Sequence, residues 1–388
     1  MTFDFDTIVS RRHTNSYKWD SHGDAPDVIQ MWVADMDFRT APCVTDALAE
    51  RVSHGIFGYT SVPESFYDAI TRWFLRRHNW SIDRSHILYT SGVVPAISAV
   101  IKALAKPGEG VIVTTPVYNC FFSSIRNNGC AIKESPMIYA NGRYAIDFDH
   151  LRRLAADPHN TLLLLCNPHN PGGRVWTPEE LAQVADICRH NNVTVISDEI
   201  HCELTYSLGG YTPFAVIAQE YGLSYVSCVS PSKAFNTAGL QIAAIISPDS
   251  GYRQRIDRAI NDNEVCDVNP FGVIGLTAAY NHGEQWLGEL IDYLKGNIEA
   301  AAAQFRLRAP QLTFTPLEAT YLAWIDCRAL GKSSCELAEE ILHKGKVRVS
   351  PGSDYGGAGE GFIRINLAMP RSLAEEGIKR ILDVLTSA

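Results

Sequence analysis

Short apolar runs alternate with helical patterns along the middle of the chain. Six of these runs are almost continuously apolar, and they comprise residues 87–90, 111–114, 161–165, 193–196, 225–229 and 242–246. Continuous apolar runs of this length are typical of strands that are covered on both faces of a parallel sheet. The pattern therefore predicts an α/β fold, in which helices wrap a mostly parallel sheet.

The segment before the run at 193–196 illustrates the helices that connect these strands. Thr177 is a capping residue, Pro178 suits the first helical position, and two acidic residues follow in the first turn. Leu181 and Val184 then begin an apolar series at helical spacing. These signals predict a helix that returns the chain to the next strand.

The pattern changes after about residue 281. We expect a long helix through Gln304, strands near 321–325 and 362–367, and helices at 333–344 and 372–386. These elements predict a second, smaller α+β domain. No low-complexity linker is visible, so we expect the boundary in a helix. The expected units are an N-terminal segment (1–45) that packs with the small domain, a large domain (46–281) and the small C-terminal domain (282–388).

Charge and composition exclude several classes of function. The 34 basic and 43 acidic residues give a net charge of -9, and no basic run suggests a nucleic-acid partner. Because the first residues lack a signal pattern and no apolar run reaches membrane-spanning length, we expect a cytoplasmic protein without a membrane partner. The ten cysteines show no Cys-x-x-Cys pair, which argues against a disulfide framework and a zinc site.

Polar residues follow three of the predicted strands, at the sheet edge where α/β proteins bind ligands. They are the turn-rich loop 167–173, Asp198 with His201 close behind it, and Lys233. Each has an ordinary alternative, since Asp198 suits a helix cap and Lys233 a solvated surface. No second histidine at ligand spacing accompanies His201, so we expect no metal.

The residues around Lys233 favour a catalytic role for it over a solvated surface position. It lies at a strand end, next to the hydroxyls of Ser230 and Ser232 that can hold a phosphate, and the neighbouring strand offers Asp198. A lysine, a phosphate site and a carboxylate are what Schiff-base chemistry on pyridoxal 5'-phosphate requires.

The same residues carry a resemblance to a known family that covers nearly the whole chain. Three motifs in this order resemble the fold type I pyridoxal-phosphate enzymes of the class I/II aminotransferase superfamily. The motifs are Asn170-Pro171-x-Gly173, Asp198-Glu199-x-His201 and Ser230-x-Ser232-Lys233. Four further segments are similar to the MalY/PatB group of carbon-sulfur β-lyases. They are MWVADMDF (31–38), FGYT (57–60), SGVVP (91–95) and SPSKAFNTAGL (230–240).

The resemblance implies a fold and a set of site residues. The fold is a large domain with a mostly parallel seven-stranded sheet and a smaller α+β domain. Lys233 would bind the cofactor and move the Cα proton, Asp198 would pair with the ring nitrogen, and Asn170 would donate to the ring oxygen. The other implied cofactor-binding residues are Tyr118 against the ring face, where plain packing is the alternative, His201, Gly92, Val93, Val94, Ser230, Ser232 and Tyr59.

The resemblance also implies how the substrate is bound. Arg364 would bind the α-carboxylate of a small amino acid with both guanidinium nitrogens, although an internal ion pair is the alternative for an arginine in an apolar strand. Trp32, Asp35 and Tyr59 complete the implied substrate site. Tyr59 would come from the partner subunit, which predicts a homodimer.

Two departures favour a lyase over a transaminase. Gln241 stands where aminotransferases of this superfamily commonly have a phosphate-binding arginine, and His201 stands where they commonly have a tyrosine. We therefore expect β-elimination from a cysteine S-conjugate such as cystathionine, giving a thiol, pyruvate and ammonia. The alternatives are an aminotransferase for a small amino acid and, from another class, a regulatory binding protein that retains the fold.

Overall fold

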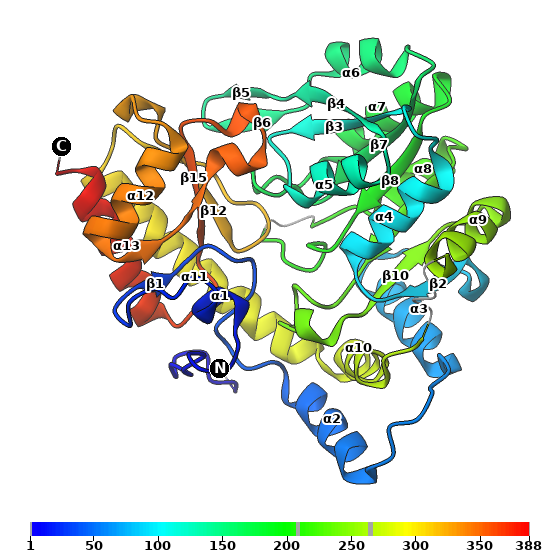
Figure 1. The fold of residues 1–388 in the computed structure, drawn as a ribbon, viewed down its shortest axis with the longest axis horizontal. Coiled ribbons are helices and arrows are strands. Elements are labelled where there is room, and N and C mark those ends of the chain that lie inside the picture. The colour runs from blue at the N-terminus through cyan, green and yellow to red at the C-terminus, as the bar shows by residue number, and fades with distance from the viewer. Residues whose placement is uncertain (1, 207–209, 263–266, 388) are drawn as a thin grey trace.

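A computed structural model describes residues 2–206, 210–262 and 267–387. Its largest feature is a sheet of seven strands in the order β2-β10-β9-β8-β7-β3-β4 (Figure 1). Only β10 runs antiparallel to its neighbours. The strands are β2 (Ile87–Thr90), β3 (Gly110–Thr115), β4 (Ala131–Pro136), β7 (Asn160–Cys166), β8 (Thr194–Asp198), β9 (Tyr225–Val229) and β10 (Ala243–Ile246). The predicted α/β fold with a mostly parallel sheet is confirmed.

The strand β7 shows why the apolar runs are continuous. Leu162 and Leu164 pack into one buried cluster, and Leu163 and Leu165 pack into another on the opposite face. Because side chains alternate between the faces of a strand, a sheet that is covered on both faces needs apolar residues at every position.

Helices on the two faces supply these clusters. The helices are α4 (Val93–Leu104), α5 (Cys120–Asn127) and α9 (Ser250–Asn261) on one face, and α6 (Phe148–Ala155), α7 (Pro178–His190) and α8 (Phe214–Glu220) on the other. The predicted helix start at Thr177 is confirmed, since its side chain and that of Glu180 form a reciprocal capping box.

Six of the seven strands match the predicted apolar runs, and the edge strand β4 does not. Lys133 and Glu134 lie within β4, whose side chains are mostly partly buried or exposed. The short hairpin of β5 (Ile138–Ala140) and β6 (Arg143–Ala145) follows it. An edge strand can carry polar residues because one side of it remains open to water. A search for continuous apolar runs therefore does not predict β4.

The C-terminal part forms a four-stranded sheet in the order β11-β12-β15-β14, covered by helices. The strands are β11 (Thr313–Phe314), β12 (Leu322–Asp326), β14 (Ser350–Pro351) and β15 (Phe362–Asn366), and the helices are α11 (Glu284–Arg308), α12 (Ser334–Gly345) and α13 (Arg371–Leu385). Together with Ile29 and Met31 of the N-terminal part, these elements enclose a second buried cluster. The α+β character that the sequence predicts for this region is present.

The N-terminal part contacts both halves of the molecule (Figure 1). After the single turn α1 (Tyr17–Asp20), β1 (Ile29–Gln30) pairs with β13 (Val347–Arg348). The helices α2 (Pro42–His54) and α3 (Glu64–His78) then pack against α10 (Pro270–His282) beside the large sheet. The domain limits at residues 45 and 281 stay a prediction.

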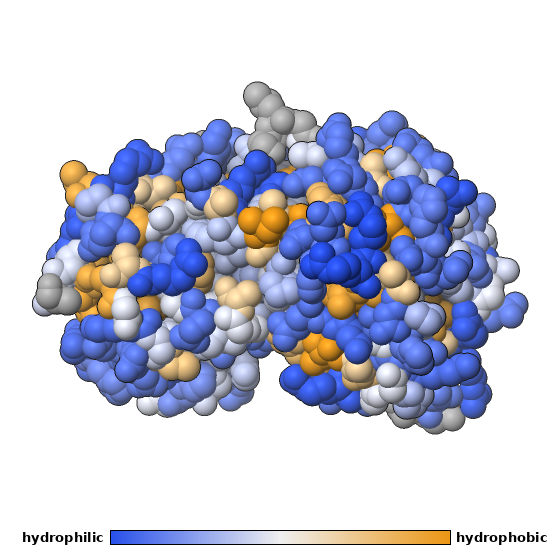
Figure 2. All heavy atoms as spheres, turned by 90° about the horizontal axis from the view of Figure 1, so that it is seen from above, coloured by the Kyte–Doolittle hydropathy of each residue, from blue (hydrophilic) through white to orange (hydrophobic). Residues whose placement is uncertain are grey.

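The surface is predominantly polar on the face drawn in Figure 2, where apolar residues form small, separate patches. Among the described residues, no helix combines the length and the apolar character that a membrane span needs. The nine cysteines in the described part of the chain are free thiols, and most of them are buried.

Candidate active site

A cavity of about 290 Å³ lies where β7, β8 and β9 end. It brings together nine of the residues that the sequence predicts for the site. These residues are Gly92, Val93, Val94, Tyr118, Asn170, Asp198, His201, Ser232 and Lys233. Because the carboxyl ends of parallel strands meet at one sheet edge, loops that are far apart in the chain converge here.

Lys233 lies in the turn that follows β9. Its Nζ donates a hydrogen bond of 2.6 Å to the carbonyl oxygen of Ala34. Desolvation lowers the pKa of the amine, and the charge of Arg364 acts in the same direction, whereas Asp35 and Asp198 oppose them. A lowered pKa leaves more of the amine uncharged, as a nucleophile and proton acceptor requires.

Asp198 is the last residue of β8 and is 3% exposed. Its Oδ1 accepts a hydrogen bond of 3.1 Å from the backbone nitrogen of Ile200. Burial raises the pKa of the carboxyl to about 7, although this hydrogen bond and the charge of Lys233 oppose the shift. A cationic partner in the cavity would favour the charged carboxylate, and a protonated ring nitrogen has the required charge.

The N-terminus of α4 forms part of the cavity wall. Gly92 is the N-cap and provides no side-chain acceptor, and the first hydrogen bond of the helix is donated by Ala96. The amides of Val93 and Val94 are therefore available to an anion, which the helix dipole also favours. Gln241, in place of an arginine, lines the same cavity.

Arg364 in β15 is buried, at 5% exposure. It donates to the Trp32 carbonyl at 2.8 Å and to the Asn170 Oδ1 at 3.2 Å, and its guanidinium lies over the Tyr355 ring at 4.7 Å. No carboxylate in the described part of the chain lies within ion-pair distance, and its Nε has no hydrogen-bond partner there. The internal ion pair that the sequence left open is not formed, so this charge can receive a substrate carboxylate.

Two aromatic rings complete the wall of the cavity. Burial lowers the pKa of His201 well below its usual range, with smaller effects from the charges of Lys233 and Arg364, so the imidazole is neutral. Burial raises the pKa of Tyr118, which keeps its hydroxyl protonated. Both rings are thus uncharged surfaces near Lys233 and Asp198.

Five of the predicted residues, Arg364 among them, lie outside the cavity lining within this chain. The Ser230 hydroxyl donates to the Ile242 carbonyl at 2.6 Å, which holds the turn before Lys233. The Trp32 indole donates to the Lys18 carbonyl, and Asp35 pairs with Arg11. Tyr59 is 98% exposed.

The sequence did not single out the Ala34 carbonyl, the acceptor for Lys233. Any residue can present a carbonyl, so no side-chain pattern marks this role, although residue 34 belongs to the segment MWVADMDF. Lys18 and Arg11, which bind this segment, were also missed because isolated basic residues usually lie on the surface.

A possible metal-ligand group lies elsewhere, where His78, Cys202 and Glu203 meet beside α3. Glu203 already accepts hydrogen bonds from Trp73 and His78, both at 2.7 Å, and from Arg77 at 3.0 Å. Because an ion pair with Arg77 satisfies the carboxylate, we expect a structural cluster here. His201 is not part of this group.

Pyridoxal 5'-phosphate fits the chemistry of these residues. The amides at the start of α4 suit the phosphate, Asp198 suits the ring nitrogen, Lys233 suits the aldehyde, and Tyr118 offers a ring face. Among the described residues, the buried carboxyl of Asp198 accepts a hydrogen bond from the Ile200 amide and from no charged group. The cofactor ring nitrogen would supply that partner.

Comparisons with known proteins agree with this arrangement. The family model "Aminotransferase class I and II" matches residues 26–381. The chain is 41% identical to cystathionine beta-lyase PatB of Bacillus subtilis over 98% of its length and all of the relative. It is 33% identical to protein MalY of Escherichia coli over 99% of both chains. A crystal structure of cystalysin from Treponema denticola, which contains pyridoxal 5'-phosphate, superposes with a TM-score of 0.95 at 34% identity over 99% of both chains.

Proposed function

Because the chain belongs to the aminotransferase class I and II family, we propose that it is a pyridoxal-phosphate-dependent carbon-sulfur β-lyase. The substrate is a cysteine S-conjugate such as cystathionine, and the products are a thiol, pyruvate and ammonia. The proposal depends mainly on the cavity that joins Lys233, Asp198 and Asn170, beside which Arg364 has no acidic partner among the described residues. The full-length similarity to cystathionine beta-lyase PatB supports elimination over amino transfer.

The chain first holds the cofactor and the substrate in place. Bound pyridoxal 5'-phosphate supplies an electron sink for the electron pair of a broken Cα–H bond. Asp198 keeps the ring nitrogen protonated, and the Asn170 amide, whose oxygen accepts from Arg364, can donate to the ring oxygen. Arg364 binds the substrate α-carboxylate through two parallel hydrogen bonds. These contacts orient the Cα–H bond toward Lys233.

Lys233 then moves the proton. Its uncharged amine removes the proton from the substrate Cα, and the bond from Cβ to sulfur breaks with the electron pair leaving on sulfur. The sulfur takes a proton and departs as the thiol. Water releases the remaining three-carbon unit as pyruvate and ammonium, so that one substrate and one water give three products.

Purified protein with cystathionine and a lactate-dehydrogenase couple tests this function. We expect continuous pyruvate formation together with one free thiol for each pyruvate, because both products come from the same elimination. Efficient amino transfer to an oxo acid without pyruvate would replace the lyase by an aminotransferase. Neither activity in protein that contains the cofactor would favour the regulatory alternative.

We also propose that the enzyme is a homodimer that shares its active sites. Tyr59 lies between α2 and α3 in a stretch without helix or strand, and its side chain is 98% exposed. Ile56 and Phe57 in the same stretch are 67% and 56% exposed. Exposed apolar residues in one segment are typical of a surface that is buried in an assembly. A second copy of the chain would bury this segment and receive Tyr59 at its phosphate site.

Subunit mixing tests the shared site. We expect Tyr59→Ala and Lys233→Ala to be nearly inactive when each is pure. If they are mixed under conditions that exchange subunits, half of the dimers contain one site with both residues intact. Pyruvate formation should therefore recover to about a quarter of the wild-type rate.

A matched mixture controls for unspecific recovery. Lys233→Ala mixed with Asp198→Asn creates no intact site, because both residues of a site come from one chain, so activity should stay at the background. Recovery in this control, or a monodisperse monomer with full activity, would contradict the shared dimer.

A further inference from the structure

The segment from Trp32 to Met36 is held by side chains instead of by regular secondary structure. Each of its five carbonyl groups accepts a hydrogen bond from at least one side chain. The donors are Arg364 and Ser350 to Trp32, Asn366 to Val33 and Asp35, Lys233 and Tyr321 to Ala34, Lys18 to Asp35, and Arg11 and Asn236 to Met36. Buried carbonyls need such partners, so the position of this segment depends on these donors.

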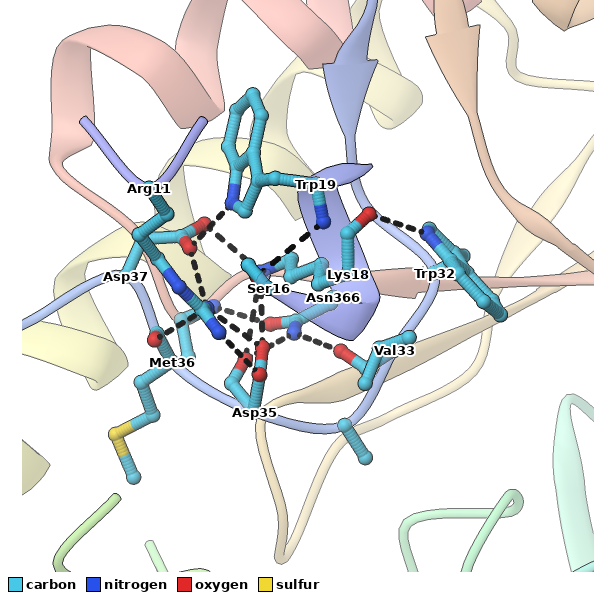
Figure 3. A network of polar contacts seen from close by, with 12 residues as sticks. Arg11, Ser16, Lys18, Trp19, Trp32, Val33, Asp35, Met36, Asp37 and Asn366 are labelled. Carbon is cyan, nitrogen blue, oxygen red and sulfur yellow. Dashed lines mark hydrogen bonds and ion pairs between the residues drawn. The ribbon is translucent and has the colours of Figure 1, made fainter. Parts of the chain in front are cut away.

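The centre of this network is a cluster of four charges, drawn in Figure 3. Lys18 is completely buried, and its Nζ lies 2.8 Å from Asp37 and 3.7 Å from Asp35. Arg11 binds the same two carboxylates, at 2.6 Å from Asp35 and 2.9 Å from Asp37. The Trp19 indole donates to Asp37 at 2.8 Å. Two cations thus balance two carboxylates, and none of these four side chains is among the residues that line the cavity.

Two backbone carbonyls of the same segment accept hydrogen bonds from Lys233 and Arg364. The Ala34 carbonyl accepts from the Lys233 amine at 2.6 Å and from the Tyr321 hydroxyl at 3.0 Å. The Trp32 carbonyl accepts from Arg364 at 2.8 Å. A shift of this segment therefore moves the acceptors of both the base and the carboxylate-binding group.

We propose that Lys18 is a positioning residue for proton transfer, because it fixes the carboxylates that anchor the Ala34 carbonyl against the amine of Lys233. The inference rests on the proposed lyase function. With substrate bound, the Lys233 amine would be free to act as the base, and its hydrogen bond to the Ala34 carbonyl would hold it in place. Lys18 itself does not touch the substrate.

A general role in packing the N-terminal segment is the competing explanation, and Arg12 provides the matched control. Arg12 donates to the carbonyls of Ala25, Pro26 and Val28, and it has no hydrogen bond to residues 32–38. Loss of Arg12 should loosen the N-terminal segment and also removes its contact with the Trp19 ring at 5.2 Å, but it leaves the ion pairs of Lys18 and Arg11 with the two carboxylates in place. Lys18→Met and Arg12→Met therefore separate positioning from packing.

Two measurements test the proposal in these variants. In Lys18→Met, we expect kcat for pyruvate formation to fall about tenfold, with a smaller change in KM, because small misplacements of reacting groups are costly. The isotope effect with Cα-deuterated substrate should rise, since proton transfer limits the rate more strongly. Arg12→Met should keep the wild-type kcat and isotope effect.

Hydrogen exchange on cofactor-free protein gives a readout that is independent of activity. The amides of Met36 and Asp37 donate to Asn236 and Ala368, so they should be protected in the wild type. We expect them to exchange about tenfold faster in Lys18→Met, since local opening becomes easier. In Arg12→Met, their exchange should stay unchanged.

The outcomes are distinguishable from failure of the lyase function. A wild-type protein that forms no pyruvate would overturn the lyase function. The amide exchange rates of Met36 and Asp37 would still show whether Lys18 holds the segment in place. A wild-type kcat or unchanged exchange in Lys18→Met, or equal effects in Arg12→Met, would overturn the role of Lys18. If Lys18→Met does not fold, the double variant Lys18→Met/Asp37→Asn avoids leaving the Asp37 carboxylate buried without Lys18. We expect the same fall in kcat in this double variant.

Discussion

Replacing Lys233 with alanine is expected to lower kcat/KM for pyruvate formation by about 10⁴-fold or more, because the change removes both the covalent attachment of the cofactor and the proton acceptor. Lys233 and Asp198 line the same cavity, and the Lys233 amine lies 2.6 Å from the Ala34 carbonyl. The pyruvate assay with cystathionine gives the loss in activity directly. Borohydride reduction followed by peptide mass analysis should place the cofactor on Lys233 in the wild type.

A surface lysine provides the control for this result. Lys102 on α4 pairs with Asp262 at 3.0 Å and lies away from the cavity lining. Lys102→Ala should keep its activity and its borohydride label. If Lys233→Ala retained more than about one hundredth of the wild-type activity, general acid-base catalysis by this amine would be too small to account for the mechanism.

Asp198→Asn is expected to lower kcat by about 10³-fold, which is the scale for removing a preorganised charge from an active site. A neutral amide cannot keep the ring nitrogen protonated, so the ring accepts electrons poorly. The measurement is kcat at saturating cofactor, so that weaker cofactor binding does not mimic the effect. A variant with kcat within tenfold of the wild type would contradict the role of Asp198.

The same variant should change the pH dependence of stability in cofactor-free protein. Burial raises the pKa of Asp198 to about 7 from its ordinary 3.8. Its contribution to stability is therefore complete below pH 4 and is lost as the pH rises through 7, because the folded state disfavours the charged carboxylate. Thermal unfolding between pH 5 and 8 should show this loss in the wild type and a weaker slope in Asp198→Asn.

The fold was largely predictable because its sheet is covered on both faces. The runs at 161–165 and 225–229 are apolar at every position, and they correspond to β7 and β9. The polar residues that follow them converge because parallel strands end at one edge. β4 was missed since an edge strand tolerates the polar residues Lys133 and Glu134. The cytoplasmic location stays a prediction.

The sequence by itself determined the fold class, the cofactor chemistry and the identity of Lys233, Asp198, Asn170 and Arg364 as candidates. The fold class follows from the apolar pattern, and Lys233 and Asp198 follow from their chemical type at strand ends, whereas the roles of Asn170 and Arg364 are implied by the family resemblance. Only the tertiary structure decided that Arg364 has no acidic partner among the described residues and that Lys18 is buried between two carboxylates. The physical reason is that burial and pairing depend on how separate segments pack together, as Arg364 does with Trp32, 332 residues away in the chain. Backbone acceptors such as the Ala34 carbonyl carry no residue-specific signal.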